Sequence, residues 1–395
     1  MRRRTTIYGV AEMAGVSVAT VSRVVRGLPG VSERTAAAVR AAVAQLEYVP
    51  SGSAQSLASR RTGVIGLIFP DLDDPTSDSG HETLLYCDEV IRGAERAARL
   101  SGRAILIAAT HRSSDPALVS SVAAKVDGLV ILARSVAGPE LRTLASQMPV
   151  VLLAGRRSIP NADLVSADNE GGCHTITSHL IKDHGCRNLV FLAGPPDSPD
   201  GTTRMAGFKR AMAEGGLEVT QSNIWRGNFT EAAGRRAAYE LFAKKIGLRN
   251  ADHSTASRSS GDNLKSKMGI PDGLVAGNDQ MAIGATTALS ELGLAVPGDV
   301  AVGGFDDIQL SRLVTPSLTT VRQPMRDLGK QSVEMLVERL SGARSTRKVA
   351  TLATQLVVRA SCGCEIEQSG LSQGRLSRSL NNTPDSHRRL SELSQ

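Results

Sequence analysis

The stretch that decides the fold of the N-terminal region is IYGVAEMAGVSVATVSRVVRGLPGVSERTAAAVRAAVAQLEYVP, residues 7–50. Its apolar residues recur at helical spacing, which predicts three short amphipathic helices around one small core. Gly15 ends the first helix, because glycine readily takes the left-handed backbone of a tight turn. Ser17 caps the second helix, and Ser32 opens the third with Glu33 in its first turn. This pattern predicts a helix-turn-helix, a fold that inserts its second helix into the DNA major groove.

The second predicted helix carries the residues that are expected to contact DNA. Its valines at 21, 24 and 25 face the core, which leaves the other side free. The predicted DNA-binding residues on that free side are Ser17, Val18, Ala19, Thr20, Ser22, Arg23 and Arg26. We expect Val18 and Ala19 to pack on thymine methyl groups, and Arg23 to make a bidentate contact with guanine. Arg26 adds a cation for phosphate.

The charge distribution supports a DNA-binding role for this region. Residues 1–61 contain nine arginines and three glutamates, a net charge of +6, and the whole chain carries +7. Residues 62–395 therefore contribute only +1. Nearly all the excess positive charge lies where phosphates would be met, whereas an ordinary alanine-rich helical bundle has no need of it.

The same residues resemble the headpiece of the LacI/GalR family of bacterial transcription factors. The resemblance rests on residues 7–25, 31–33 and 46–50, and continues into residues 51–58, which are similar to the family's hinge helix. It implies that Leu57 enters the minor groove; a large apolar side chain can wedge a base step apart, although an ordinary linker leucine is the alternative. Two positions depart from the family pattern. Gly9 replaces an acidic residue, and Arg26 replaces asparagine.

The composition of the whole chain limits its class. At 395 residues and 41% apolar content, the chain can fold as two or three units with sizeable cores. No apolar run approaches the roughly 20 residues that cross a bilayer, and the basic residues 2–4 lead directly into polar helical sequence. We therefore expect a cytoplasmic, nucleoid-associated protein with no membrane partner.

The cysteines and histidines do not suggest a metal centre. Five cysteines are too few and scattered for a disulfide framework, and Cys362 and Cys364 form the only close pair. No histidine lies near this pair in the sequence. His174, His179 and His184 recur at five-residue steps, which spreads them around a helix so that they cannot share one ion. From the sequence we therefore expect no metal, no cofactor and no catalytic residue.

From residue 63 onward, short β-branched runs alternate with amphipathic helices. The predicted strands are 64–69, 104–109, 128–133, 150–153, 189–192, 273–276, 300–305 and 354–359, and the predicted helices are 89–100, 202–214, 231–244, 281–292 and 325–340. Such alternation predicts α/β lobes, each a doubly wound parallel sheet. The last helix and strand are expected to cross between the two lobes.

Two such lobes present the carboxyl ends of their strands to a common cleft, where a small ligand is expected. The polar residues that follow predicted strands are Asp71, Asp73, Asp74, Arg204, Asn278, Asp279, Asp306 and Asp307. An arginine and carboxylates facing one cleft suit a hydroxyl-rich ligand, because each makes charge-assisted hydrogen bonds. The alternative for each aspartate and asparagine is a helix cap or a turn.

The resemblance to the LacI/GalR family extends through this region to about residue 360. It rests on residues 193–195, 204–208, 277–285 and 304–307, and implies a two-lobed domain similar to periplasmic sugar-binding proteins. It also implies that Arg204, Asn278 and Asp306 face the effector; Asp74 is a further candidate. The resemblance weakens over residues 73–88, where the family's asparagine-proline-aromatic run is replaced and its sugar-stacking ring is missing.

The predicted organisation is a DNA-binding headpiece (1–50), a hinge (51–62), a two-lobed effector-binding and dimerisation domain (63–364) and a disordered tail (365–395). Residues 250–267 are predicted to form a surface loop. We interpret the chain as a homodimeric repressor that binds double-stranded DNA at a near-palindromic operator under control of a carbohydrate effector. The alternatives are a sugar or nucleoside enzyme, for which no phosphate loop or nucleophile elbow is present, and a periplasmic binding protein, which needs a signal peptide.

Overall fold

The computed structural model describes residues 6–49, 61–70, 83–110, 115–155, 159–243, 269–343 and 346–364. Leu57, Asp71, Asp73 and Asp74 lie outside the described residues, as do the predicted loop 250–267 and the predicted tail 365–395. No helix within the described ranges combines the length and the apolar character needed to cross a membrane.

The headpiece consists of three helices, as the sequence predicts. They are α1 (Ile7–Ala14), α2 (Val18–Val25) and α3 (Glu33–Gln45). Gly15 ends α1 in the left-handed conformation with φ 64°. Ser17 caps α2 by accepting a hydrogen bond from Thr20 N at 3.2 Å. The core is formed by apolar side chains from all three helices, and its fully buried members are Val10, Val21 and Val39.

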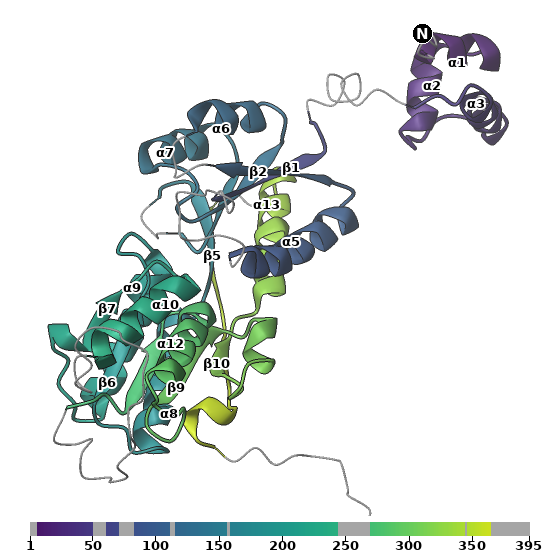
Figure 1. The fold of residues 1–395 in the computed structure, drawn as a ribbon. Coiled ribbons are helices and arrows are strands. Elements are labelled where there is room, and N and C mark those ends of the chain that lie inside the picture. The colour runs from purple at the N-terminus through teal and green to yellow at the C-terminus, as the bar shows by residue number, and fades with distance from the viewer. Residues whose placement is uncertain are drawn as a thin grey trace, which may run out of the picture. The chain divides into compact units, whose positions relative to one another are not determined.

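The first lobe, called the N lobe here, is built on a sheet of six strands (Figure 1). In spatial order these are β11 (Val349–Leu352), β5 (Ala162–Ala167), β4 (Val150–Leu153), β3 (Gly128–Leu132), β1 (Val64–Pro70) and β2 (Ala104–Thr110). All neighbouring strands are parallel. Its helices are α5 (Thr83–Leu100), α6 (Pro116–Ala123), α7 (Gly138–Gln147) and α13 (Met325–Leu340). Separate clusters of buried apolar residues lie against the two faces of the sheet, so the lobe has three layers.

The second lobe, called the C lobe here, repeats this arrangement. Its strands in spatial order are β12 (Gln355–Val357), β10 (Thr319–Arg322), β9 (Ala301–Asp306), β8 (Gly273–Ala276), β6 (Leu189–Ala193) and β7 (Ile224–Arg226). All pairs are parallel except β10 with β12. Its longer helices are α8 (Asn169–Lys182), α9 (Pro199–Glu214), α10 (Glu231–Ala238) and α12 (Asp279–Glu291). Shorter helical turns are η1 (Gln221–Asn223), η2 (Tyr239–Ala243), η3 (Gln309–Arg312) and η4 (Ala360–Cys362).

The chain passes between the lobes three times. It leaves β5 for α8, returns from β10 to α13, and crosses again from β11 to β12. Each crossing is a short connection between elements of different sheets. The cleft between the lobes is therefore bounded by three adjacent connections, which is the geometry expected of a hinge.

Each lobe also contains a pair of helices that meet at glycines. In the N lobe α5 packs on α13, and a Cβ added at Gly329 would lie 2.0 Å from the backbone oxygen of Val90. In the C lobe α10 packs on α12, and a Cβ added at Gly284 would lie 2.0 Å from the backbone oxygen of Glu231. Glycine is required at both positions because the helix backbones touch.

The structure confirms two parallel lobes and corrects several predicted elements. The predicted last strand, 354–359, is only β12 and runs antiparallel to β10. The predicted helix 89–100 begins earlier, as α5, and the predicted helix 231–244 ends its α-helical part at Ala238. Strands β5, β7, β10 and β11 and helices α6 and α7 were not predicted, and the helix expected to carry His174, His179 and His184 ends at Lys182, as α8.

Candidate functional site

The headpiece presents part of the predicted DNA-binding set to solvent. Ser17, Ala19, Arg23 and Arg26 are exposed. Arg23 Nη2 donates a hydrogen bond to the backbone oxygen of Pro29 at 3.3 Å, which turns the guanidinium toward the loop after α2. The exposed arginines remain the predicted guanine and phosphate contacts.

The other predicted DNA-binding residues on α2 are less exposed to solvent than expected. Val18, Thr20 and Ser22 are half-buried, and Val18 packs against the headpiece core. The expectation that Val18 is entirely free was therefore wrong. The cause is its position in the first turn of α2, where the side chain lies over the junction with the other helices. Ala19 is left as the exposed apolar contact on this helix.

Arg204 forms the centre of the predicted effector site. It lies on α9 with 4% of its surface exposed. Its Nε donates to Asn169 Oδ1 at 2.8 Å, and its Nη1 donates to the backbone oxygen of Gly277 at 2.5 Å. Its Nη1 also lies 3.4 Å from Asp306 Oδ1. The guanidinium carbon lies 3.9 Å from the centre of the Phe305 ring, so the cation is held on an aromatic face.

Two carboxylates share this one cation. Burial raises the pKa of Asp306, and the nearby charge of Asp200 adds to the rise, while Arg204 and a hydrogen bond from Gln323 oppose it. Burial also raises the pKa of Asp200, against the effects of Arg204 and Asn169. Asp306 has φ 123°, a backbone conformation that is costly for a residue with a side chain. Such strain beside a buried charge cluster is typical of a functional site.

Tyr86 on α5 adds an aromatic group from the opposite lobe. Burial raises its pKa, and the charges of Asp200 and Asp306 act in the same direction. The hydroxyl therefore lies within electrostatic range of the cluster around Arg204. The expectation that residues 73–88 lack a sugar-stacking ring stays a prediction, because Tyr86 packs against the apolar core of the N lobe.

The side chains of Asn278 and Asp279 form hydrogen bonds with other parts of the C lobe. Asn278 caps α12 through Oδ1, which accepts from Met281 N at 3.0 Å, and its Nδ2 donates to the backbone oxygen of Phe229 at 2.8 Å. Asp279 accepts hydrogen bonds from the Ser311 and Thr320 hydroxyls and from Ile308 N. Burial raises the pKa of Asp279, and the neighbouring charge of Asp306 adds to this.

Asp307 also differs from its neighbour Asp306. Its side chain is 1% exposed and forms ion pairs with Arg322, Arg359 and Arg312. Its carboxylate is therefore neutralised by the protein. A cavity of 510 Å³ lies beside it, where β10 leads into α13, and Asp306 and Gln323 are among its lining residues. Both Asp306 and Asp307 line this cavity, and Asp307 is the one whose carboxylate is already paired with arginines.

The arrangement is suited to hydrogen bonding with a polar, uncharged molecule. Arg204 supplies a buried donor, and Asp306 and Asp200 supply acceptors. Adjacent hydroxyl groups satisfy both kinds of partner, and the protein environment strengthens each charge-assisted bond.

A separate cluster contradicts the sequence-based interpretation of the histidines. His179 and His184 lie close together, with 3.2 Å between their Nε2 atoms, and Cys362 and Cys364 approach both. The prediction that His174, His179 and His184 cannot share one ion assumed that all three lie on one helix. The structure shows that α8 ends at Lys182, so His184 is free to turn back over the last turn.

Comparisons with known proteins identify the class. The model for "Bacterial regulatory proteins, lacI family" matches residues 6–51. The model for "Periplasmic binding proteins and sugar binding domain of LacI family" matches residues 62–246, and that for "Periplasmic binding protein-like domain" matches residues 177–362. Catabolite control protein A of Priestia megaterium is 32% identical over 338 residues, which cover 84% of this chain and 92% of that protein.

Solved structures agree with this result. The Lac repressor dimer bound to operator and the anti-inducer ONPF is 26% identical with a TM-score of 0.73, covering 91% of this chain and 99% of that one. A complex of the transcriptional regulator CelR with cellobiose is 29% identical with a TM-score of 0.64, covering 91% and 100%. These proteins are DNA-binding regulators rather than enzymes. The chain belongs to the LacI family of bacterial transcriptional regulators.

Proposed function

We propose that this chain is a cytoplasmic repressor that binds a near-palindromic operator as a homodimer and is controlled by a sugar or sugar derivative in the interlobe cleft. The observation that carries the effector assignment is the buried Arg204 between Asn169, Gly277 and Asp306. The cellobiose in the CelR complex supports a carbohydrate as the ligand class.

Control follows from the hinge. A ligand that contacts both lobes favours one closure state of the cleft, and it changes DNA affinity only through its different affinities for the closure states. In a dimer, closure changes the spacing of two headpieces whose half-sites lie a fixed distance apart. A coupling of about 1–3 kcal/mol is typical of such systems.

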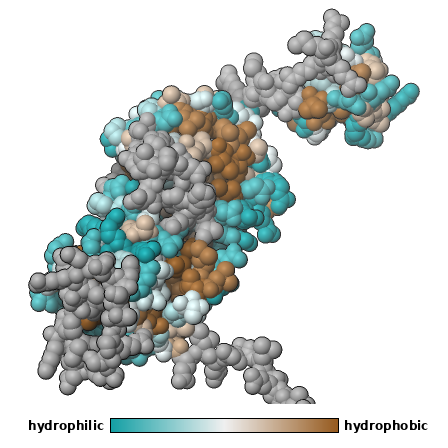
Figure 2. Space-filling model, viewed as in Figure 1, coloured by the Kyte–Doolittle hydropathy of each residue, from teal (hydrophilic) through white to brown (hydrophobic). Residues whose placement is uncertain are grey.

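Dimerisation through the effector domain is supported by exposed apolar surface. Figure 2 shows hydrophobic surface on the N lobe in this view. Exposed apolar side chains of this lobe include Leu100 at the end of α5 and Ile107 on the edge strand β2, with 76% and 50% of their surface accessible. A second copy of the chain is the proposed occupant, and sedimentation of the full chain tests this.

The decisive experiment is an operator titration with and without ligand. Operator fragments are first selected from random DNA, and ligands are selected from a sugar panel by thermal stabilisation. Arg204→Ala and Asp306→Ala should keep operator affinity near normal while losing the response to ligand. Arg210→Ala is the matched control, because Arg210 lies on the same helix and is exposed. A folded Arg204 variant that responds at the wild-type ligand concentration would remove this residue from the site.

The DNA contacts are tested with the same fragments. Arg23→Ala should cost roughly 1–3 kcal/mol at the operator and relax base preference at one position of each half-site. Arg26→Ala should weaken all DNA equally, because it is assigned to phosphate. Leu57→Ala should reduce both DNA bending and affinity if this residue wedges a base step. Equal weakening of operator and random DNA by the Arg23 change would contradict its assignment.

A further inference from the structure

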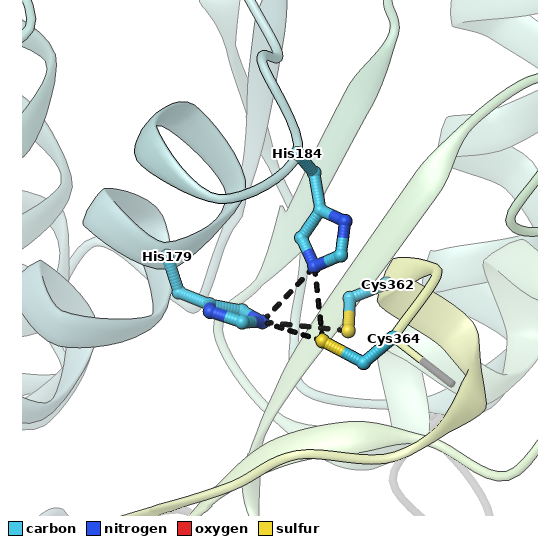
Figure 3. Close-up of side chains that lie close together, drawn as sticks. All are labelled: His179, His184, Cys362 and Cys364. Atoms are coloured by element: carbon cyan, nitrogen blue, oxygen red, sulfur yellow. Dashed lines mark hydrogen bonds between the residues drawn. The ribbon is translucent and has the colours of Figure 1, made fainter. Parts of the chain in front are cut away.

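We propose that His179, His184, Cys362 and Cys364 form a tetrahedral binding site for a zinc-class divalent metal ion in the C lobe. Figure 3 shows both imidazole rings and both sulfur atoms directed toward a common point. The site is distinct from the effector cleft and from the headpiece, so it goes beyond the function proposed above.

The four ligands come from two segments that are far apart in sequence. His179 lies in the last turn of α8, and His184 follows the end of that helix. Cys362 ends η4, and Cys364 comes two residues later. Gly363 between the cysteines has φ 102°, a left-handed conformation that glycine adopts readily and that turns the chain sharply between the two sulfurs.

Four of the six distances between the ligand atoms are close to those of a zinc tetrahedron. Zinc bonds of about 2.0–2.1 Å to nitrogen and about 2.3 Å to sulfur place the ligand atoms of a tetrahedron roughly 3.3–3.8 Å apart. His179 Nε2 lies 3.2 Å from His184 Nε2, 3.4 Å from Cys362 Sγ and 3.7 Å from Cys364 Sγ. Cys364 Sγ lies 3.3 Å from His184 Nε2. These distances are close to those of a zinc tetrahedron, and all four ligand atoms lie within 4.8 Å of one another.

Hydrogen bonding alone does not account for this arrangement. His179 Nδ1 lies 2.6 Å from Asp183 Oδ2, and if it donates to that carboxylate, Nε2 of the neutral ring keeps a single lone pair. Three groups approach that one lone pair: His184 Nε2 and the two thiols. One lone pair cannot accept from all three. A cation at the common point would instead satisfy four ligand atoms together.

The surroundings of His179 match those of a metal ligand. A ligating histidine usually directs its second nitrogen to a carboxylate or carbonyl, which fixes the ring and makes it a better donor to the metal. Asp183 provides that carboxylate. His179 and Cys362 are buried with 8% and 2% of their surface exposed, whereas His184 and Cys364 are half-buried. One side of the site is thus enclosed and the other admits an ion.

A closed set of four protein ligands defines a structural role rather than a catalytic one, because no position is left for substrate. The ion would fasten η4 to the end of α8. The segment between β12 and η4 contains Arg359, whose guanidinium pairs with Asp307 beside the cleft residue Asp306. The metal would therefore hold the last interlobe connection at its C-lobe end, on which hinge motion depends.

The test uses the full chain, purified without a polyhistidine tag after growth with zinc. We expect about one equivalent of zinc per chain after gel filtration. Replacement by cobalt should give the visible bands of a tetrahedral ion together with a near-ultraviolet thiolate charge-transfer band. His184→Gln and Cys364→Ser, both at half-buried positions, should lose the ion and the thiolate band. His174→Gln is the matched control, since His174 lies on α8 and pairs with Glu214 instead.

A second measurement separates a structural ion from weak surface binding. Chelation of wild-type protein should lower its Tm by at least about 5 °C, and re-addition of zinc should restore it. The chelator should have little effect on Cys364→Ser. The proposal would be overturned if the wild-type protein contained no more zinc than the His184→Gln variant, or if cobalt-loaded wild-type protein showed no thiolate band. A mass showing a Cys362–Cys364 disulfide in freshly purified protein would also overturn it.

Discussion

The N lobe and the C lobe share one strand order and differ in what they place at the cleft. The order is β11-β5-β4-β3-β1-β2 in the N lobe and β12-β10-β9-β8-β6-β7 in the C lobe, so each strand has a counterpart at the same place in the other sheet. The C lobe contributes the buried charges Arg204, Asp200 and Asp306, whereas the N lobe contributes Tyr86. The repeated topology provides two similar halves, and the buried charges of this cluster belong to the C lobe.

This asymmetry has an energetic basis. The described carboxyl groups whose pKa is raised by burial, namely Asp200, Asp279 and Asp306, all belong to the C lobe. Buried charges cost stability unless they are paired, so the C lobe carries a destabilising cluster that a ligand can relieve. In the proposed function, the N lobe is the partner that closes over the ligand.

The largest expected effect comes from breaking the charge cluster. Arg204→Met should lower the free energy of unfolding by about 3–5 kcal/mol, because it leaves Asp306 and Asp200 buried without a cation. The double variant Arg204→Met with Asp306→Asn should recover part of the loss. Urea unfolding measures both, and hydrogen exchange should locate the weakening in β6, β8 and β9 rather than in β1 and β3. Equal weakening in both lobes would contradict the comparison.

Substitution of the glycines at the two helix contacts, Gly329 in the N lobe and Gly284 in the C lobe, should give the next largest loss of stability. Gly329→Ala should destabilise by about 1–3 kcal/mol, because the added carbon separates α5 from α13. Gly284→Ala should do the same for α10 and α12 in the C lobe. Native-state hydrogen exchange distinguishes them, since each variant should weaken its own lobe first. Gly102→Ala gives a contrasting control, where no atom lies near but φ is positive.

The pH dependence of stability should also separate the lobes. The folded-state pKa of Asp306 is raised above its ordinary value of 3.8, so the folded C lobe takes up a proton before the unfolded chain does. This group's contribution to stability therefore increases as pH falls through the raised pKa and is lost as pH rises. Each unit of difference corresponds to about 1.4 kcal/mol. Asp306→Asn should remove this slope, and unchanged pH dependence would show that Asp306 does not titrate there.

The smallest expected effect concerns the ion pair between the lobes. Arg134 Nε lies 2.9 Å from Asp197 Oδ2, and both side chains are well exposed. Arg134→Ala should change stability by no more than about 1 kcal/mol and should shift ligand affinity only slightly. The wild-type contribution should fall with added salt. Calorimetric titration with the identified ligand measures this, and a large loss of affinity would assign Arg134 to the binding site itself.

The sequence predicted those elements whose pattern was local. The headpiece helices followed from caps and spacing, and the central strands followed from continuous apolar runs. Strand β5 was missed because Asp163 interrupts its apolar run. In the structure that carboxylate accepts from Lys348 N at 2.7 Å, a contact across 185 residues. Strands β10 and β11 were missed because each has only four residues. The first is largely polar, and the second is partly exposed.

The candidate site residues also fall into those that the sequence could predict and those that it could not. Arg204 and Asp306 could be proposed because charged residues after strands meet at the cleft of an α/β fold. Tyr86 could not be found, because its position depends on how α5 packs. The histidine and cysteine cluster was missed because its halves are separated by 178 residues between His184 and Cys362, and because the end of α8 decides where His184 lies.

The three crossings between the lobes also set the order in which the chain can fold during synthesis. The strands β6 to β10 of the C lobe are contiguous in sequence, whereas the N lobe needs α13 and β11, which are made only after β10. A growing chain folds as its domains become complete. The C lobe can therefore acquire most of its sheet on the ribosome while the N lobe still lacks its edge strand and the helix that packs on α5. The N lobe begins to emerge first, but it cannot complete its structure until α13 and β11 have been synthesised.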